Sequence, residues 1–125
     1  MLYRVQDHSG RGPYKPQFSH RWADDAGPIV KPWWTELGIS VQDAIAKLAE
    51  IPADMHVGCA FRSMDKLREW FTPKELRNLD RFGFYVIQLE PDRIVAETDT
   101  QVVFGITKPL HWWPQFDRCA GRKAA

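Results

Sequence analysis

The chain has 125 residues, with 17 lysines and arginines against 16 aspartates and glutamates, and 44% of its residues are hydrophobic. This length fits one ordinary domain with a self-sufficient core. A net charge of +1 argues against a protein that coats DNA or a membrane surface. No apolar run approaches the roughly 20 residues that cross a bilayer, and none has the length of a signal peptide. We therefore expect a cytoplasmic protein that does not bind a membrane.

The two cysteines, Cys59 and Cys119, lie far apart and form no CxxC or paired Cys/His spacing. This arrangement argues against a structural zinc site, and no metal site is expected. Two thiols in a chain of this length are typical of a reducing compartment, although the sequence leaves open whether they ever pair.

The first 38 residues predict a strand followed by a long ordered loop. Leu2–Gln6 alternates like a short strand, and glycines and prolines then interrupt regular structure from Asp7 to Gly38. A disordered linker would contain few large aromatic residues. This loop contains five of them, which we expect to hold it in place: Tyr14, Phe18, Trp22, Trp33 and Trp34.

Three helices are predicted in the middle of the chain. Ser40 caps the first, whose apolar stripe is Val41, Ala44, Ile45 and Leu48, and Pro52 ends it. After a short strand at Val57–Phe61, Ser63 caps a second helix with Met64, Leu67, Trp70 and Phe71 on one face. Thr72-Pro73-Lys74-Glu75 is a capping-box start for the third, in which Leu76, Leu79 and Phe82 face inward and Gly83 takes a left-handed conformation at the end.

The last third predicts strands at Phe84–Leu89, Arg93–Ala96 and Gln101–Ile106, followed by an aromatic segment. The expected fold is α+β, a single compact domain over residues 1–117 with a small mixed or antiparallel sheet and about three helices. Residues 118–125 are expected to be a frayed basic tail. The predicted core is Leu67, Trp70, Phe71, Leu76, Leu79, Val86, Val102 and Phe104.

No standard catalytic motif is present, and each candidate functional residue has a structural alternative. Gly10-Arg11-Gly12 is either a phosphate-binding loop or a tight turn with an exposed arginine. The run Tyr14–Trp22 mixes aromatic and basic residues, as single-strand nucleic-acid sites do, or packs beneath the loop. Arg4 on the first strand needs a partner, a ligand or access to water. Glu97 and Gln101 flank a hairpin, where a carboxylate either stabilises a developing cation or is simply solvated.

Four short motifs are spread over most of the chain: Tyr3-Arg4-Val5, Gly10-Arg11-Gly12-Pro13-Tyr14, Gly58-Cys59-Ala60-Phe61-Arg62-Ser63 and Gln101-Val102-Val103-Phe104. Together with Leu67 and Trp70-Phe71 they resemble a group of small phage and prophage proteins. That resemblance implies no particular activity.

A more distant resemblance is to the ADP-ribosyltransferase-like fold. In that family a first strand carries an Arg or His that contacts NAD, a later strand and helix carry an aromatic–Ser/Thr element, and a late strand begins with a catalytic Glu. Arg4, Phe61-Arg62-Ser63 and Gln101-Val102-Val103 match these three elements in order. Gln101 departs from the pattern, because a neutral amide cannot stabilise an oxocarbenium-like transition state as a carboxylate does. Glu97, four residues earlier, is the nearest acidic substitute.

Three functions remain open at this point. In the first, the chain is a non-catalytic phage accessory protein that binds a host or phage protein in a defence or anti-defence role, with exposed aromatic residues as anchors. Alternatively, it is an ADP-ribosyltransferase-like protein with an active or degenerate pocket for NAD or a related nucleotide, or a nucleic-acid-binding module. The predicted ligand-binding residues are Arg4, Arg11, Tyr14, Phe61 and Ser63, and the predicted catalytic positions are Gln101 and Glu97.

Overall fold

Two three-stranded antiparallel sheets organise the chain in a computed structural model, which describes residues 1–24, 27 and 30–119. One sheet has the order β1-β3-β6 and the other the order β2-β5-β4. The strands are β1 (Leu2–Gln6), β2 (His56–Ala60), β3 (Tyr85–Leu89), β4 (Arg93–Glu97), β5 (Val102–Ile106) and β6 (Gln115–Arg118). The sheets meet where Tyr3 and Phe61 exchange two backbone hydrogen bonds of 2.8 Å.

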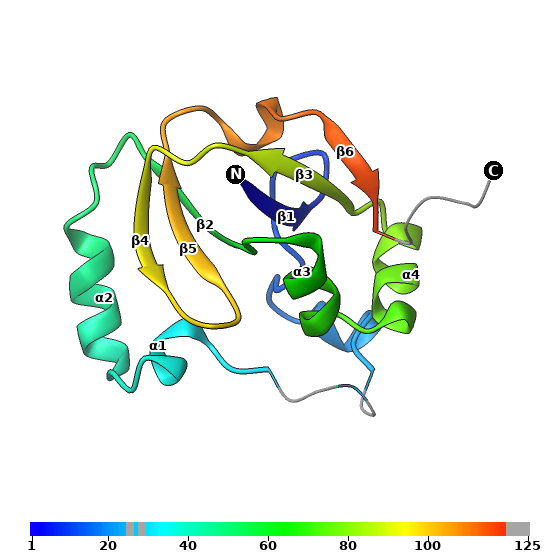
Figure 1. The fold of residues 1–125 in the computed structure, drawn as a ribbon, viewed down its shortest axis with the longest axis horizontal. Coiled ribbons are helices and arrows are strands. Elements are labelled where there is room, and N and C mark those ends of the chain that lie inside the picture. The colour runs from blue at the N-terminus through cyan, green and yellow to red at the C-terminus, as the bar shows by residue number, and fades with distance from the viewer. Residues whose placement is uncertain (25–26, 28–29, 120–125) are drawn as a thin grey trace.

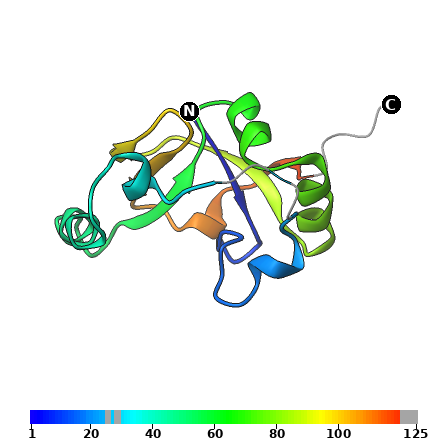
Figure 2. The ribbon, with the colours of Figure 1, turned by 90° about the horizontal axis from the view of Figure 1, so that it is seen from below.

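Helices surround these sheets on several sides (Figure 1). They are η1 (Ser19–Arg21), α1 (Trp33–Glu36), α2 (Val41–Ala49), α3 (Met64–Trp70), α4 (Pro73–Arg81) and η2 (Leu110–Trp112). Figure 2 shows that the N-terminal loop projects from one side of the molecule, with α2 and α4 at opposite ends. The α+β prediction is confirmed, and the antiparallel strands are divided between two small sheets.

Local capping chemistry sets the helix starts as the sequence predicts. The Ser40 and Ser63 side chains accept the amides of Asp43 and Lys66, and Thr72 and Glu75 form a complete capping box at α4. Gly83 has φ 83°, the left-handed conformation that ends α4. These contacts satisfy backbone donors that the first turn of a helix leaves unpaired.

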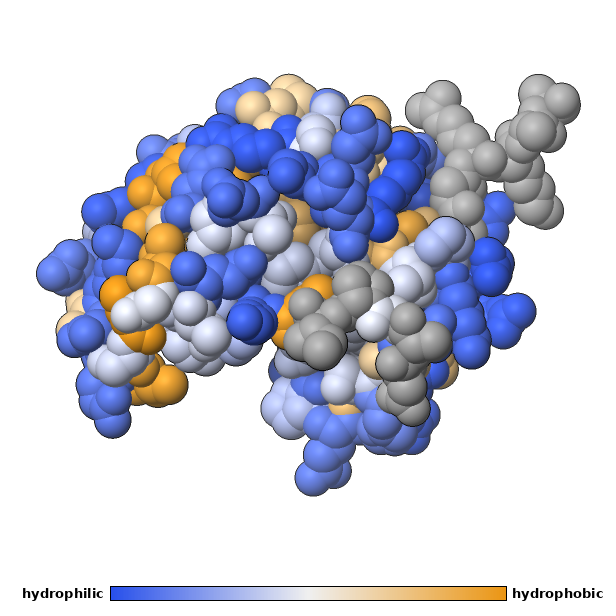
Figure 3. Space-filling view, turned by 60° about the horizontal axis from the view of Figure 1, so that its bottom comes forward, coloured by the Kyte–Doolittle hydropathy of each residue, from blue (hydrophilic) through white to orange (hydrophobic). Residues whose placement is uncertain are grey.

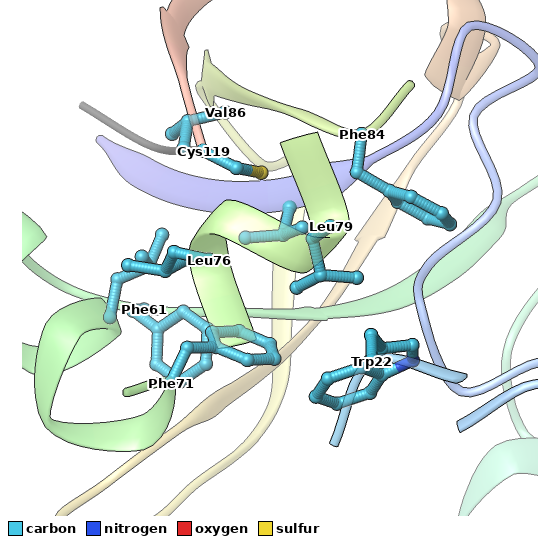
Figure 4. Close-up of a cluster of buried hydrophobic side chains, with 10 residues drawn as sticks. Trp22, Phe61, Phe71, Leu76, Leu79, Phe84, Val86 and Cys119 are labelled. Carbon is cyan, nitrogen blue, oxygen red and sulfur yellow. The ribbon is translucent and has the colours of Figure 1, made fainter. Parts of the chain in front are cut away.

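The largest buried cluster lies between α3, α4 and the β1-β3-β6 sheet (Figure 4). Its members include Trp22, Phe61, Phe71, Leu76, Leu79, Phe84, Val86 and Cys119. A second cluster contains Val102 and Phe104 of β5, which are almost completely buried. Burying one large apolar side chain contributes about 1.5–3 kcal/mol, so these clusters hold the sheets and helices together.

Two packing predictions are wrong. Trp70 is only partly buried, because it lies at the edge of the main cluster and its indole reaches Tyr14. Phe82 is 44% exposed, since the chain leaves α4 there and the ring only meets Phe18 at its edge. The apolar stripe of α2 forms as predicted, but only Ala44 is buried, in a cluster with Trp33, Ala96 and Val103, whereas Val41 and Ile45 are 50% and 60% exposed.

The predicted long loop contains η1 and α1, and it buries Trp22 and Trp33. Residues 25–26 and 28–29 of this loop lie outside the described residues. Of the predicted tail, Arg118 belongs to β6 and pairs with Asp80, while Cys119 is buried; residues 120–125 lie outside the described part of the chain. No helix within the described residues is long and apolar enough to span a bilayer.

Candidate functional site

A cleft of about 690 Å³ opens beside the point where the two sheets meet. Figure 3 shows the molecule hollowed on this side. Its walls come from the N-terminal loop, the segment that leads into α1, the strand β2 and the end of α3. This volume is within the range of small-molecule and cofactor sites.

Arg4 of β1 reaches from the first sheet to the second at this cleft. The side chain is only 7% exposed, and its Nε, Nη1 and Nη2 donate to Gln6 Oε1 (3.1 Å), Cys59 O (2.8 Å) and Gly10 O (3.2 Å). These acceptors are all uncharged. A guanidinium has five N–H groups, so two are left without a partner among the described residues.

Burial lowers the pKa of Arg4 to about 10, although the nearby Cys59 and Asp7 act to raise it. The guanidinium is therefore still charged at neutral pH. Burying a cation without a hydrogen-bonded counter-charge is costly, so this position is suited to an anion supplied from the cleft.

Two glycines keep space open beside this guanidinium. A Cβ at Gly58 would lie 2.8 Å from Arg4 Nη1, and one at Gly12 would lie 3.4 Å from Nη2. Neither glycine has a positive φ, so backbone conformation does not require them. Their absent side chains instead allow Arg4 to lie at the cleft wall.

The charged residues that line the cleft are all positive. Arg4, Arg11, Lys15 and Lys31 line it, and among the residues described there none of the lining residues is acidic. Lys15 is paired with Asp7. Burial alone would raise the pKa of Asp7, but hydrogen bonds from Lys15, Ser9 and Arg11 lower it to about 2. In a chain with a net charge of +1, positive side chains are therefore concentrated at this cleft.

Aromatic rings form much of the remaining surface. Trp70 Nε1 donates to Tyr14 Oη at 2.6 Å, and Tyr14 stacks on Phe71. Tyr14 is 54% exposed, but desolvation of its hydroxyl raises the pKa despite the opposing hydrogen bond from Trp70, so the phenol stays neutral. Trp33 and Trp34 of α1 also line the cleft. Such rings offer faces on which a planar base can stack.

Gln101 lies just before β5 and lines the cleft, but its amide is used for internal contacts. Gln101 Nε2 donates to Lys31 O (3.0 Å) and to Glu36 Oε1 (2.5 Å). Glu36 also accepts from Thr98 and Thr100. Burial would raise the pKa of Glu36, but these hydrogen bonds and the charge of Lys31 lower it below its usual range.

Glu97 and Ser63 do not line the cleft. Glu97 forms a two-pronged ion pair with Arg62, with bonds of 2.8 and 2.6 Å, beside a second, polar cavity of about 490 Å³ that Gln101 also touches. Ser63 accepts the amide of Lys66 and caps α3. The structure thus brings together five of the predicted residues in the cleft: Arg4, Arg11, Tyr14, Phe61 and Gln101.

Sequence reasoning missed Gly58, Lys31 and Glu36. No local signal marks Glu36, since its partners lie more than 60 residues away. Cys59 also lines the cleft and is exposed there; partial desolvation raises the pKa of its thiol against the opposing charge of Arg4, which makes it a poor nucleophile. The described residues include no group of three His, Cys, Asp or Glu side chains that could hold a metal.

A family model described as Bacteriophage T4 Y00F protein matches residues 1–110. Those residues include every residue named above as lining the cleft. Neither a curated protein nor a solved structure shows a significant match to the chain.

Proposed function

The chain belongs to the bacteriophage T4 Y00F protein family, and we propose that it is a phage accessory protein whose cleft binds a nucleotide such as NAD or ADP-ribose. The observation that carries this proposal is the buried, charged guanidinium of Arg4, which lines the cleft and whose hydrogen bonds go to neutral oxygens. A phosphate offers the charge and the acceptor oxygens that this group lacks.

The rest of the cleft fits the other parts of a dinucleotide. Arg11 and Lys31 add positive charge along the walls, whereas the charge of Lys15 is paired with Asp7, and this favours a ligand with more than one negative charge. The rings of Tyr14 and Trp70 provide an apolar surface for a base. A ligand with phosphates alone would leave this aromatic surface unused.

The distant ADP-ribosyltransferase resemblance supports the same ligand class. The elements that carry its three landmarks are neighbours in the fold: β5 pairs with β2, and Phe61 after β2 bridges to β1 beside Arg4. Because Gln101 is an amide and Glu97 pairs with Arg62 away from the cleft, the protein binds the nucleotide and turns it over weakly or not at all.

Calorimetry with NAD and with ADP-ribose tests this proposal on the wild type and on Arg4→Ala. A hydrogen bond to a charged group contributes about 1.5–3 kcal/mol, which corresponds to roughly a 10- to 150-fold loss of affinity in Arg4→Ala. Arg62→Ala is the matched control, since Arg62 lies outside the cleft and bonds Glu97 instead. It should bind like the wild type.

Gly12→Ala provides a second variant, which keeps Arg4 and adds a methyl group 3.4 Å from Nη2. It should also weaken binding, even if Arg4→Ala proves too unstable to measure. If a folded wild type gives no heat with NAD, ADP-ribose or AMP, the proposal is wrong. Unchanged binding in both cleft variants would place the nucleotide elsewhere.

A second candidate function, binding of a host or phage protein, is favoured by the exposed apolar face of α2. Val41, Ile45 and Leu48 lie on this face, and apolar atoms are visible along that side of the molecule in Figure 3. An Ile45→Glu variant should lose a partner that co-purifies in fixed proportion with the wild type from phage-infected cells, while nucleotide binding is retained. Retention of that partner by the variant would contradict this role for α2.

A further inference from the structure

We infer that Glu36 and Gln101 are a pair of positioning residues that holds the Trp33–Trp34 wall of the cleft in place. This inference rests on the proposed nucleotide site and assigns a role to two residues within it. Gln101 is then a positioning residue at the site where the ADP-ribosyltransferase pattern places a catalytic carboxylate.

The contacts of Glu36 connect α1 to the hairpin between β4 and β5, which lie next to each other in Figure 1. Its carboxylate accepts from Gln101 Nε2 at 2.5 Å, from Thr100 Oγ1 at 2.6 Å and from Thr98 Oγ1 at 3.0 Å. The same Gln101 amide donates to Lys31 O at 3.0 Å. The Gln101 side chain therefore bonds to both ends of the segment 31–36, at Lys31 O and at the Glu36 carboxylate.

This segment needs such an anchor because α1 is too short to be stable alone. It has four residues, and isolated helices shorter than about 12 residues are marginal in water. Trp33 packs with Ala44, Ala96 and Val103, but Trp34 is only partly buried. Loss of the Glu36–Gln101 contact would leave Trp33 packing and the Thr98 and Thr100 hydroxyls to hold α1, and would leave Lys31 O without its donor.

Glu36 also explains why position 101 is an amide. A glutamate at 101 would place a second carboxylate against Glu36, and two carboxylates at this distance cannot both ionise without mutual repulsion. An amide donates its N–H groups to the carboxylate and to Lys31 O instead. The amide at position 101 therefore serves to hydrogen-bond Glu36 and not to act on a reacting substrate.

The Gln101→Glu variant tests this inference through amide hydrogen exchange, which requires no ligand. Three backbone bonds report on the segment: Glu36 N to Pro32 O, Leu37 N to Trp33 O, and Gly38 N to Thr35 O. At pH 8 we expect these amides to exchange at least tenfold faster than in the wild type, and ADP-ribose to bind at least tenfold more weakly.

The pH profile separates a positioning role from simple damage to the fold. At pH 5 one of the two carboxyls takes up a proton and donates to the other, so protection should return toward that of the wild type measured at the same pH. Lys31 is the charged neighbour of Glu36. Glu36→Gln combined with Gln101→Glu should restore part of the protection, because an amide again faces a carboxylate while Lys31 O still lacks its donor.

Glu97→Gln is the control, since it alters a carboxylate on the same hairpin that pairs with Arg62. It should leave exchange in residues 36–38 unchanged. The inference is overturned if Gln101→Glu exchanges like the wild type at pH 8, or if its exchange differs from the wild type equally at pH 5 and pH 8. Because exchange is measured without nucleotide, a wild type that fails to bind ADP-ribose would refute the proposed function without affecting this test.

Discussion

Replacing Gly58 with alanine tests the contact between β2 and the Arg4 guanidinium. In the interior of an ordinary strand this change would stabilise the protein by about 0.5–1 kcal/mol, because glycine loses more backbone freedom on folding. Here the new methyl carbon would lie 2.8 Å from Arg4 Nη1 and 3.0 Å from the Phe104 ring. Three hydrogen bonds hold the Arg4 side chain, so it cannot move aside freely. We expect a net destabilisation of about 1–3 kcal/mol, as for other overpacked sites.

Urea unfolding of Gly58→Ala, Arg4→Ala and the double variant measures this contact. In the Arg4→Ala background the added methyl should cost far less than in the wild type, because its nearest neighbour is gone. Gly105→Ala is a control in the same sheet, where the new carbon would meet the flexible side chains of Arg93 and Met55 at 3.2 Å. If Gly58→Ala is as stable as the wild type, or costs the same in both backgrounds, Arg4 does not hold the position described.

Three further predictions concern stability. Thr72→Ala should cost about 1 kcal/mol in urea unfolding, because it removes the cap of α4, and a difference below about 0.3 kcal/mol would contradict that role. Asp7 has a folded-state pKa of about 2 against an ordinary value of 3.8, so its contribution to stability is present above about pH 4 and is lost as the pH falls toward 2. In Asp7→Asn the free energy of unfolding should therefore fall less steeply over this acidic range, and an unchanged pH dependence would refute this. Leu79→Ala should cost about 2–5 kcal/mol and Ile45→Ala less than about 1 kcal/mol, and similar losses would show that α2 packs more tightly than described.

The sequence was sufficient to predict features that depend on neighbouring residues. The cap residues Ser40, Ser63 and Thr72 act within three positions of their partners, so their pattern is legible in the chain. Arg4 was also identifiable, because a charge in a strand needs an explanation. Its placement between two sheets, however, depends on the contact between Tyr3 and Phe61, which are 58 positions apart.

Features set by distant contacts could not be predicted in the same way. The period of α2 correctly indicates a helix with an apolar stripe, but it cannot say that Ile45 faces solvent while Ala44 packs against Ala96 and Val103. Likewise, the amide of Gln101 has meaning only once Glu36 is known to lie beside it. The helical period predicts which residues share one face of a helix. Which other residues pack against that face is decided by the tertiary structure.

A crystal structure of the protein with ADP-ribose is the most direct test of the cleft as a nucleotide site. The account predicts a phosphate oxygen about 2.7–3.2 Å from an Nη atom of Arg4, with the adenine on the aromatic wall that contains Tyr14 and Trp70. Nucleotide bound elsewhere on the molecule, with the Arg4 cleft free of it, would contradict the account.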